Sequence, residues 1–156
     1  MILIDTNIFL EMLLGRSKAE QCKALLDMIS EGRAESAVTH FSIRSVEAIM
    51  RKKAGELTSF LRALDLTVGL YVFDKTLADE FSASILTGTT KLDFDDAIQY
   101  YAAKKLGAAA IVSFDHDFDD LDIPVSSLTR SGRQAGSRET PVALSVSHIG
   151  CPVYSG

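Results

Sequence analysis

The sequence predicts an α/β domain in which a parallel sheet of about five strands lies between two layers of helices. Short apolar runs alternate with amphipathic segments of helical length from residue 1 to about residue 126, as in domains built from strand–helix–strand units. A length of 156 residues, with 47% hydrophobic and 24% charged residues, suits one globular domain with a single core. Together these observations favour a three-layer α/β/α fold.

The elements expected in the first half follow from apolar periodicity and from the residues that end each run. Ser42 is expected to cap the helix that follows it, because a serine hydroxyl can accept a hydrogen bond from a free amide of the first turn. Gly15 and Gly32 mark helix ends. In chain order the expected elements are a strand over Met1–Ile4, helices over Ile8–Leu14 and Lys18–Ser30, a strand over Glu35–Thr39, and helices over Ser42–Lys53 and Leu57–Leu66.

The second half continues the same alternation. Gly88 and Gly107 follow amphipathic segments and are expected to end two further helices. The expected elements are a strand over Leu70–Phe73, helices over Lys75–Leu86 and Phe94–Leu106, a strand over Ala109–Phe114, and a short strand near Ile123–Val125.

The last segment, residues 127–156, differs from the rest of the chain. It contains six Ser and four Gly and has a net charge of +2, against −7 for residues 1–126. It lacks a helical period, although Pro141–Ser147 alternates weakly and is compatible with an edge strand. We therefore expect a domain over 1–126 and a flexible, non-catalytic tail over 127–156. An extension foreign to the natural protein is the alternative.

Composition limits the function and the location. The formal net charge of −5 argues against a protein that coats DNA, but it leaves open an enzyme that acts on nucleic acid. No apolar run approaches the roughly 18 residues that a membrane helix needs, and the N-terminus lacks the pattern of a secretory signal. Cys22 and Cys151 have no metal-ligand spacing, so we expect free thiols in a reducing cytoplasm.

Four carboxylates occupy positions where a soluble fold usually has apolar residues. Asp5 and Asp115 each end a strand-like run, Glu47 lies on the apolar side of a helix, and Asp96 opens another helix. Buried carboxylates are costly unless they are paired or bind a cation. Because the site of a parallel sheet lies beyond the carboxyl ends of its strands, these residues predict a shared site for a hard divalent metal.

Two of these positions also have a purely structural interpretation. Asp5-Thr6-Asn7 suits a strand-to-helix turn, since all three residue types cap helices. In the functional interpretation, Asp5 is a metal ligand that Thr6 or Asn7 supports. At the later helix start, Asp93 is the expected cap and Asp96 the expected ligand, because negative charge there is favoured by the helix dipole.

Glu47 lies between the apolar stripe of its helix and a neighbouring stripe that contains Arg44 and Arg51. An ion pair with one of these arginines is the alternative to a role in a cleft. The loop after the fourth strand is strongly acidic, and His116 within it is expected to be exposed and not a ligand. A solvated acidic surface is the expected role of Asp119, Asp120 and Asp122.

Four segments of the chain resemble the PIN domain family. They are Ile2-Leu3-Ile4-Asp5-Thr6-Asn7, the mid-chain Glu47, Asp96-Ala97 at a helix start, and Val112-Ser113-Phe114-Asp115-His116-Asp117-Phe118. The resemblance covers residues 1 to about 126 and implies a parallel sheet of about five strands between helices. It also implies a Mg²⁺- or Mn²⁺-dependent ribonuclease, and many prokaryotic members, of the VapC type, are homodimeric toxins of toxin–antitoxin modules.

Carried over by position, the resemblance implies an acidic quartet that holds one or two Mg²⁺ or Mn²⁺ ions. The quartet is Asp5, Glu47, Asp96 and Asp115, with Asp117 as an auxiliary ligand and Thr6, Asn7 and Asp93 in support. Ser113 replaces the threonine that is frequent in the family and keeps its hydroxyl. Basic residues that are candidates for contacts with RNA phosphates are Arg44, Arg51, Lys52, Lys53 and Lys91.

The leading functional hypothesis is a cytoplasmic metal-dependent endoribonuclease that acts on single-stranded or looped RNA, as a homodimer inhibited by a small antitoxin protein. One alternative keeps the fold without catalysis, as a module that binds RNA or protein. The other is a different α/β phosphohydrolase of the haloacid-dehalogenase type. Such enzymes use a second aspartate two residues after the first, where this chain has Asn7.

Overall fold

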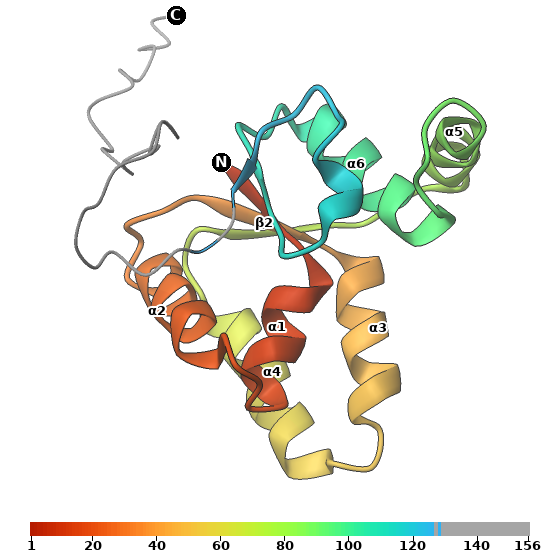
Figure 1. Cartoon of the computed structure of the whole chain (residues 1–156). Coiled ribbons are helices and arrows are strands. Elements are labelled where there is room, and N and C mark those ends of the chain that lie inside the picture. The colour runs from red at the N-terminus through yellow and green to blue at the C-terminus, as the bar shows by residue number, and fades with distance from the viewer. Residues whose placement is uncertain (127, 129–156) are drawn as a thin grey trace, which may run out of the picture.

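A computed structural model describes residues 1–126 and 128 of the protein. One five-stranded, all-parallel sheet runs through it in the order β3-β2-β1-β4-β5 (Figure 1). The central strand β1 pairs with β2 through Ile2 and Ser36 and with β4 through Ile4 and Val112. The strands are β1 (Ile2–Ile4), β2 (Ser36–Thr39), β3 (Leu70–Phe73), β4 (Ile111–Val112) and β5 (Val125–Ser126).

Helices cover both faces of this sheet, which confirms the predicted three-layer α/β/α fold. Figure 1 shows α1 to α4 on one side of the sheet and α6 on the other, with α5 packed on α6. The helices are α1 (Thr6–Leu13), α2 (Ala19–Ser30), α3 (His40–Met50), α4 (Ala54–Leu66), α5 (Leu77–Thr87) and α6 (Phe94–Leu106), with the short 3₁₀ helix η1 (His116–Phe118) after β4.

Two apolar cores separate the layers, because successive residues of a strand point to opposite faces. Ile4 and Val112 face α1 to α4, where they pack with Phe9 and other buried side chains. Leu3 and Ile111 face α6 and belong to the second core. Buried apolar side chains therefore cover both faces of the central strands β1 and β4, and the polar side chains next to these strands lie at their ends.

The start of α3 differs from the prediction, which placed the N-cap at Ser42. The cap is Thr39, the last residue of β2, whose hydroxyl accepts a hydrogen bond from the Ser42 amide at 2.9 Å. The two hydroxyl groups lie 2.8 Å apart, and both residues are buried. Strand and helix therefore share a residue, and α3 starts two residues earlier than expected.

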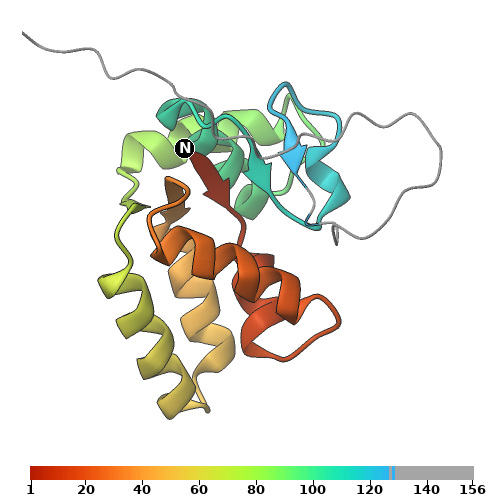
Figure 2. The same cartoon turned by 90° about the vertical axis from the view of Figure 1, so that its left-hand side faces the viewer.

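A buried carboxylate joins α5 to α6. Asp79 completes a capping box with Thr76 at the start of α5. Its side chain also accepts hydrogen bonds from the Tyr101 hydroxyl at 2.9 Å and the Lys105 ammonium at 2.5 Å. These partners hold the pKa of Asp79 below its usual range, with Lys105 as the largest cause. Lys105 and Tyr101 both lie on α6, so Asp79 joins two helices that pack side by side (Figure 2).

Three further predictions concern the tail, the two cysteines and the location of the protein. The tail expected over 127–156 and Cys151 lie outside the described residues, apart from Leu128. Cys22 is a buried free thiol, and burial raises its pKa to about 11. Within the described part, none of the helices combines the length and apolar character needed to cross a membrane. The cytoplasmic location stays a prediction.

Candidate metal centre

The site begins at the carboxyl ends of the two central strands. Asp5 follows β1 and Asp115 lies just beyond β4, and these strands are neighbours in the parallel sheet. A single hydroxyl connects them, since Ser113 donates a hydrogen bond to the Asp5 carboxylate and accepts one from the Asp115 amide at 2.9 Å. The sequence prediction that these strand ends meet is therefore confirmed by contact.

Asp5 is buried, with 2% of its surface exposed. It occupies the N-cap position of α1, and its carboxylate also faces partners outside that helix. Burial raises the pKa of Asp5, and hydrogen bonds from Ser113 and Gln99 oppose the rise. The main-chain amides of Asn7 and Thr6 oppose it too, although the side chains of these two residues form no hydrogen bond within the described part.

Asp93 and Asp96 divide the roles expected of them at the start of α6. Asp93 is the N-cap, and its carboxylate accepts a hydrogen bond from the Asp96 amide at 3.0 Å. The Asp96 side chain is left to the site, where burial raises its pKa to about 7. Nearby negative charges, in the order Asp93, Asp115, Asp5 and Asp117, add to this rise. Within residues 1–126, no positive charge pairs with Asp96 to offset the cost of burying its carboxylate.

Three carboxylates converge closely enough to share an ion. Asp96, Asp115 and Asp117 each offer an oxygen that lies within 4.8 Å of the other two. We call these three residues the acidic triad. A turn positions two of them, because Asp115 caps η1 by accepting a hydrogen bond from the Asp117 amide at 3.1 Å. An all-oxygen donor set with high negative charge suits a hard cation such as Mg²⁺ or Mn²⁺.

Glu47 lies outside the acidic triad. Its carboxylate accepts a hydrogen bond from Arg44 at 2.6 Å on the same face of α3, which is the ion pair left open by the sequence. The side chain of Glu47 is 24% exposed and that of Arg44 is 67% exposed. The ion pair does not prevent Glu47 from contributing an oxygen, and its place in a metal-binding quartet stays a prediction.

The sequence of this domain matches a known protein family. A family model described as PIN domain matches residues 1–117. The chain belongs to the PIN domain family. No curated protein sequence matches it.

Solved structures with the same fold include several toxins and their complexes. The PIN domain superposes on the Mycobacterium tuberculosis toxin VapC20, described as cleaving the sarcin–ricin loop, with a TM-score of 0.63 and 18% identity over 76% of this chain and 93% of that one. A toxin–antitoxin complex from Klebsiella pneumoniae gives a TM-score of 0.66 and 19% identity over 83% and 98%. FitAcB from Neisseria gonorrhoeae gives a TM-score of 0.57 and 22% identity over 80% of this chain and 96% of that one. At these identities the likeness concerns the fold.

The predicted RNA-contacting residues of this PIN domain fall into two groups. Lys91 lines a hollow of about 540 Å³ together with Asp117 of the acidic triad, and its ammonium lies 3.6 Å from Asp120. Arg44 is paired with Glu47 and lines a separate hollow with His40 and Lys75. By contrast, Arg51, Lys52 and Lys53 follow the last residue of α3, and an 11-residue helix carries them about 16 Å from the strand ends (Figure 1).

Gln99 is a site residue that the sequence analysis missed. It is buried, with 2% of its surface exposed, and its side chain donates a hydrogen bond to Asp5. Its carbonyl oxygen Oε1 has no hydrogen-bond partner among the described residues. A usable indication was present, since a glutamine three residues after Asp96 lies on the same side of α6 in an otherwise apolar stretch.

The acidic loop is solvated as expected, with the side chains of Asp119, Asp120 and Asp122 all more than half exposed, and Asp122 has partners on α6 as well. Asp122 accepts hydrogen bonds from the Tyr100 hydroxyl and the Lys104 ammonium of α6, each at 2.5 Å. His116 is exposed as expected and bonds to Asp119 at 2.8 Å. Asp122 therefore anchors the loop that carries Asp117, a long-range contact that an acidic run alone does not predict.

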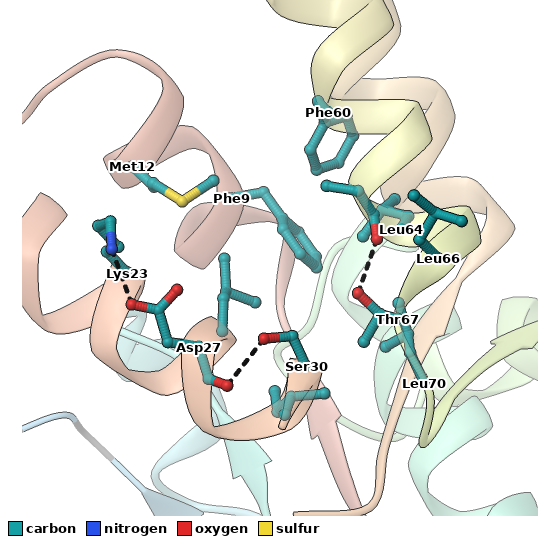
Figure 3. A pocket seen from close by; sticks show the side chains of 13 residues that line it. Phe9, Met12, Lys23, Asp27, Ser30, Phe60, Leu64, Leu66, Thr67 and Leu70 are labelled. Carbon is teal, nitrogen blue, oxygen red and sulfur yellow. Dashed lines mark hydrogen bonds and ion pairs between the residues drawn. The ribbon is translucent and has the colours of Figure 1, made fainter. Parts of the chain in front are cut away.

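An apolar groove lies on the α1–α4 side of the domain (Figure 3). It has a volume of about 350 Å³ and is lined by residues of α1, α2 and α4 together with Leu70 of β3. Figure 3 shows Phe9, Met12 and Phe60 around it, with the Lys23–Asp27 ion pair at its edge. A second hollow that shares Met12 and Phe60 continues it along α4. None of its lining residues belongs to the acidic triad.

Proposed function

We propose that this PIN-domain protein is a metal-dependent endoribonuclease and the toxin of a toxin–antitoxin pair. The observation that carries the proposal is the gathering of Asp96, Asp115 and Asp117 beside buried Asp5 at the carboxyl ends of β1 and β4. A binding module without catalysis does not need a partly buried Asp96 surrounded by other carboxylates, an arrangement that costs stability. The family match also favours this function over a haloacid-dehalogenase-type phosphatase.

The residues of the chain have separate roles in this proposal. Asp96 and Asp115 hold the ion, Asp117 assists, and Asp5 and Glu47 complete the set of oxygen ligands. Ser113 and Gln99 hold the Asp5 carboxylate in place through hydrogen bonds. When bound, a Mg²⁺ or Mn²⁺ ion supplies Lewis-acid activation of water and of the scissile phosphate.

Single-stranded RNA is the proposed substrate class. A strand without a paired partner exposes its phosphodiester groups and can bend into an open site, whereas a duplex holds its backbone rigidly. The acidic triad lies beside open hollows at the end of the sheet, which fits such a strand better than a small enclosed substrate. VapC20, which has the same fold, is described as cleaving an RNA loop.

Substitution of Asp96 tests the proposal directly. Asp96→Asn and Asp5→Asn are each expected to abolish Mn²⁺-dependent cleavage of single-stranded RNA and to keep the native circular dichroism spectrum. Asp95→Asn is the matched control, since Asp95 is the exposed neighbour outside the acidic triad. Unchanged Mn²⁺-dependent cleavage by purified Asp96→Asn protein would show that the assignment is wrong.

A small antitoxin is the proposed protein partner, and the apolar groove is the surface that supports this part of the proposal. The similar structures from Klebsiella pneumoniae and Rickettsia felis are titled as toxin–antitoxin or VapBC complexes. An apolar helix of such a partner would cover Leu66, a lining residue of the groove that is 66% exposed, in the manner of helix-in-groove recognition. A basic side chain of the same partner would then reach the acidic triad.

The partner is tested with the product of a short reading frame next to that of this chain. Its co-expressed product should inhibit cleavage by the wild-type protein. Ala63→Glu, which places a charge on an exposed position of the groove, should remove this inhibition without loss of cleavage. Arg62→Gln is the control on the same helix, because Arg62 does not line the groove. Equal inhibition of both variants would contradict this use of the groove.

A further inference from the structure

A second feature of the site involves a lysine that precedes α2. The ammonium of Lys18 lies 3.8 Å from the centroid of the Phe114 ring, which is a close cation–π contact. Phe114 directly precedes Asp115, and its ring also packs against the first apolar core. One aromatic residue therefore connects a positive charge to the loop that carries the acidic triad.

The main chain of Lys18 is fixed by its own hydrogen bonds. Its amide donates to the Glu11 carboxylate at 3.1 Å, and its carbonyl accepts from the amides of Gln21 and Cys22 at 3.1 Å. Arg16 pairs with the same Glu11 carboxylate at 3.7 Å. The turn between α1 and α2 thus holds Lys18 at a constant place, on the same side of the domain as the segment after β4 (Figure 2).

A pocket of about 320 Å³ lies between these two segments. Its volume is near the lower end of the range for small-molecule sites, roughly 300 Å³. Lys18 and Phe114 line it together with Ser113 and Asp115, so the pocket is continuous with the candidate metal centre. Its other lining residues are His116, Asp119 and Val125.

The charges of this pocket leave one cation without a carboxylate partner. Asp119 is bonded to His116, and Asp115 belongs to the acidic triad. Among the described residues, no carboxylate lies within ion-pair distance of the Lys18 ammonium, whereas Lys91, which shares a hollow with Asp117, is paired with Asp120. The aromatic face positions the charge of Lys18 and does not neutralise it, so the charge is free for an anionic ligand.

We propose that Lys18 and Phe114 form a phosphate subsite that holds the phosphodiester group next to the scissile one in a single-stranded RNA. This inference rests on the proposed function and assigns the direction in which the strand leaves the metal centre, past Ser113 toward the turn before α2. Lys18 contacts the RNA phosphate. Phe114 is a positioning residue that keeps the ammonium at the pocket.

The expected kinetic effect separates this role from catalysis. A contact to a flanking phosphate is made equally in the ground state and in the transition state, so its loss raises KM and leaves kcat unchanged. Lys18→Gln should raise KM about fivefold, the effect of losing one exposed charge pair. Lys18→Arg, which keeps the charge and the stacking on Phe114, should stay close to wild type.

The decisive experiment measures RNA binding without cleavage. The Asp96→Asn full-length protein is titrated into a fluorescein-labelled single-stranded RNA at several KCl concentrations, and the fluorescence anisotropy gives Kd. Each phosphate contact contributes about 0.7 to the slope of log Kd against log salt for a single strand. Lys18→Gln should lower the slope by about this amount and weaken binding. Arg62→Gln, which removes an exposed charge from α4, is the matched control and should leave the slope unchanged.

Phe114→Leu provides the second variant, since it keeps an apolar side chain in the core and removes the ring. It should weaken binding less than Lys18→Gln and keep the salt slope. If Lys18→Gln matches the Arg62→Gln control in both slope and KM while RNA is cleaved, the subsite is wrong and the proposed ribonuclease stands. If wild-type protein neither binds nor cleaves RNA, both proposals fail.

Discussion

Asp96 is half-buried among other carboxylates, and no cation pairs with it in the described part of the chain. An unfolded aspartate titrates near pH 3.9, whereas burial raises the pKa of folded Asp96 to about 7. Between these two pH values the folded state binds the proton of Asp96 more tightly than the unfolded state does. The free energy of unfolding therefore falls as pH rises from 4 to 7. At higher pH, the metal-free fold carries the full cost of an ionised Asp96.

Asp96→Asn should therefore stabilise the metal-free protein. Its Tm should exceed that of the wild type at pH 8, and the difference should shrink toward pH 5, because protonated Asp96 is already neutral there. Differential scanning calorimetry in EDTA measures the two curves, with Asp65→Asn on the exposed side of α4 as the control. A difference that does not change with pH would contradict a raised pKa at Asp96.

Gln99 is expected to strengthen metal binding and to lower the free energy of unfolding. Gln99→Leu removes the donor to Asp5 together with the buried, unpartnered Oε1. Loss of an outer partner of a ligand typically weakens metal binding about ten- to a hundredfold, whereas removal of an unsatisfied buried carbonyl favours folding. Calorimetric titration should show weaker Mn²⁺ binding with an equal or higher Tm, and Gln21→Leu on α2 should change neither.

At the level of the elements, most starts and ends were predictable because local residues determine them. Asp93 caps α6 as expected, and Gly107 ends it with φ near +62°, a conformation that glycine adopts without penalty. The start of α3 was not predictable in this way, because Thr39 and Ser42 both carry a hydroxyl suited to capping. Thr39 is the cap because it is the last residue of β2 that pairs with β3, so the helix begins directly after it.

Asp79 is the residue on which the packing of α5 against α6 depends. Asp79→Asn keeps the size of the side chain but removes the charge that Lys105 binds, so it should lower Tm. Because the pKa of Asp79 is lowered in the folded state, this stabilisation is present above about pH 4 and is lost as pH falls further. The Tm difference between wild type and variant should therefore shrink in acid. Asp74→Asn, an 80% exposed carboxylate before α5, is the control.

On the scale of the whole molecule, α5 presents an apolar stripe to solvent. Leu77, Phe81 and Ile85 recur every four residues and are 81%, 68% and 55% exposed. An exposed apolar stripe of this kind can bury itself against the same stripe of a second copy around a two-fold axis. This is the surface that we propose for the predicted homodimer.

Phe81→Lys should convert the proposed dimer into a monomer. The new lysine places a charge at the centre of the stripe, where it would face the same lysine of the second copy across the two-fold axis. Sedimentation equilibrium should give the mass of one chain for this variant and of two for the wild type. Glu80→Lys would disturb the Lys75 ion pair, so Ser82→Lys on the same helix is the cleaner control. A monomeric wild-type protein would contradict the dimer.

The site was less predictable than the fold, for a physical reason. Strand ends, caps and helix faces follow from local sequence, and these pointed to Asp5, Asp96 and Asp115. The contacts of Gln99 with Asp5, of Asp122 with α6 and of Lys18 with Phe114 join segments far apart in the chain. Such contacts depend on packing between layers, which periodicity does not encode.

The hydrogen bond from Ser113 to Asp5 joins residues 108 positions apart. The central strand of the sheet is thus synthesised before the other strands, but the candidate metal centre at its carboxyl end stays incomplete until the segment after β4 has been made. A nascent chain that ends before β4 has neither Ser113 nor two members of the acidic triad. The order of the strands therefore completes the acidic triad only after α6 and β4 have been synthesised, so a chain truncated before β4 should bind Mn²⁺ more weakly than the whole domain.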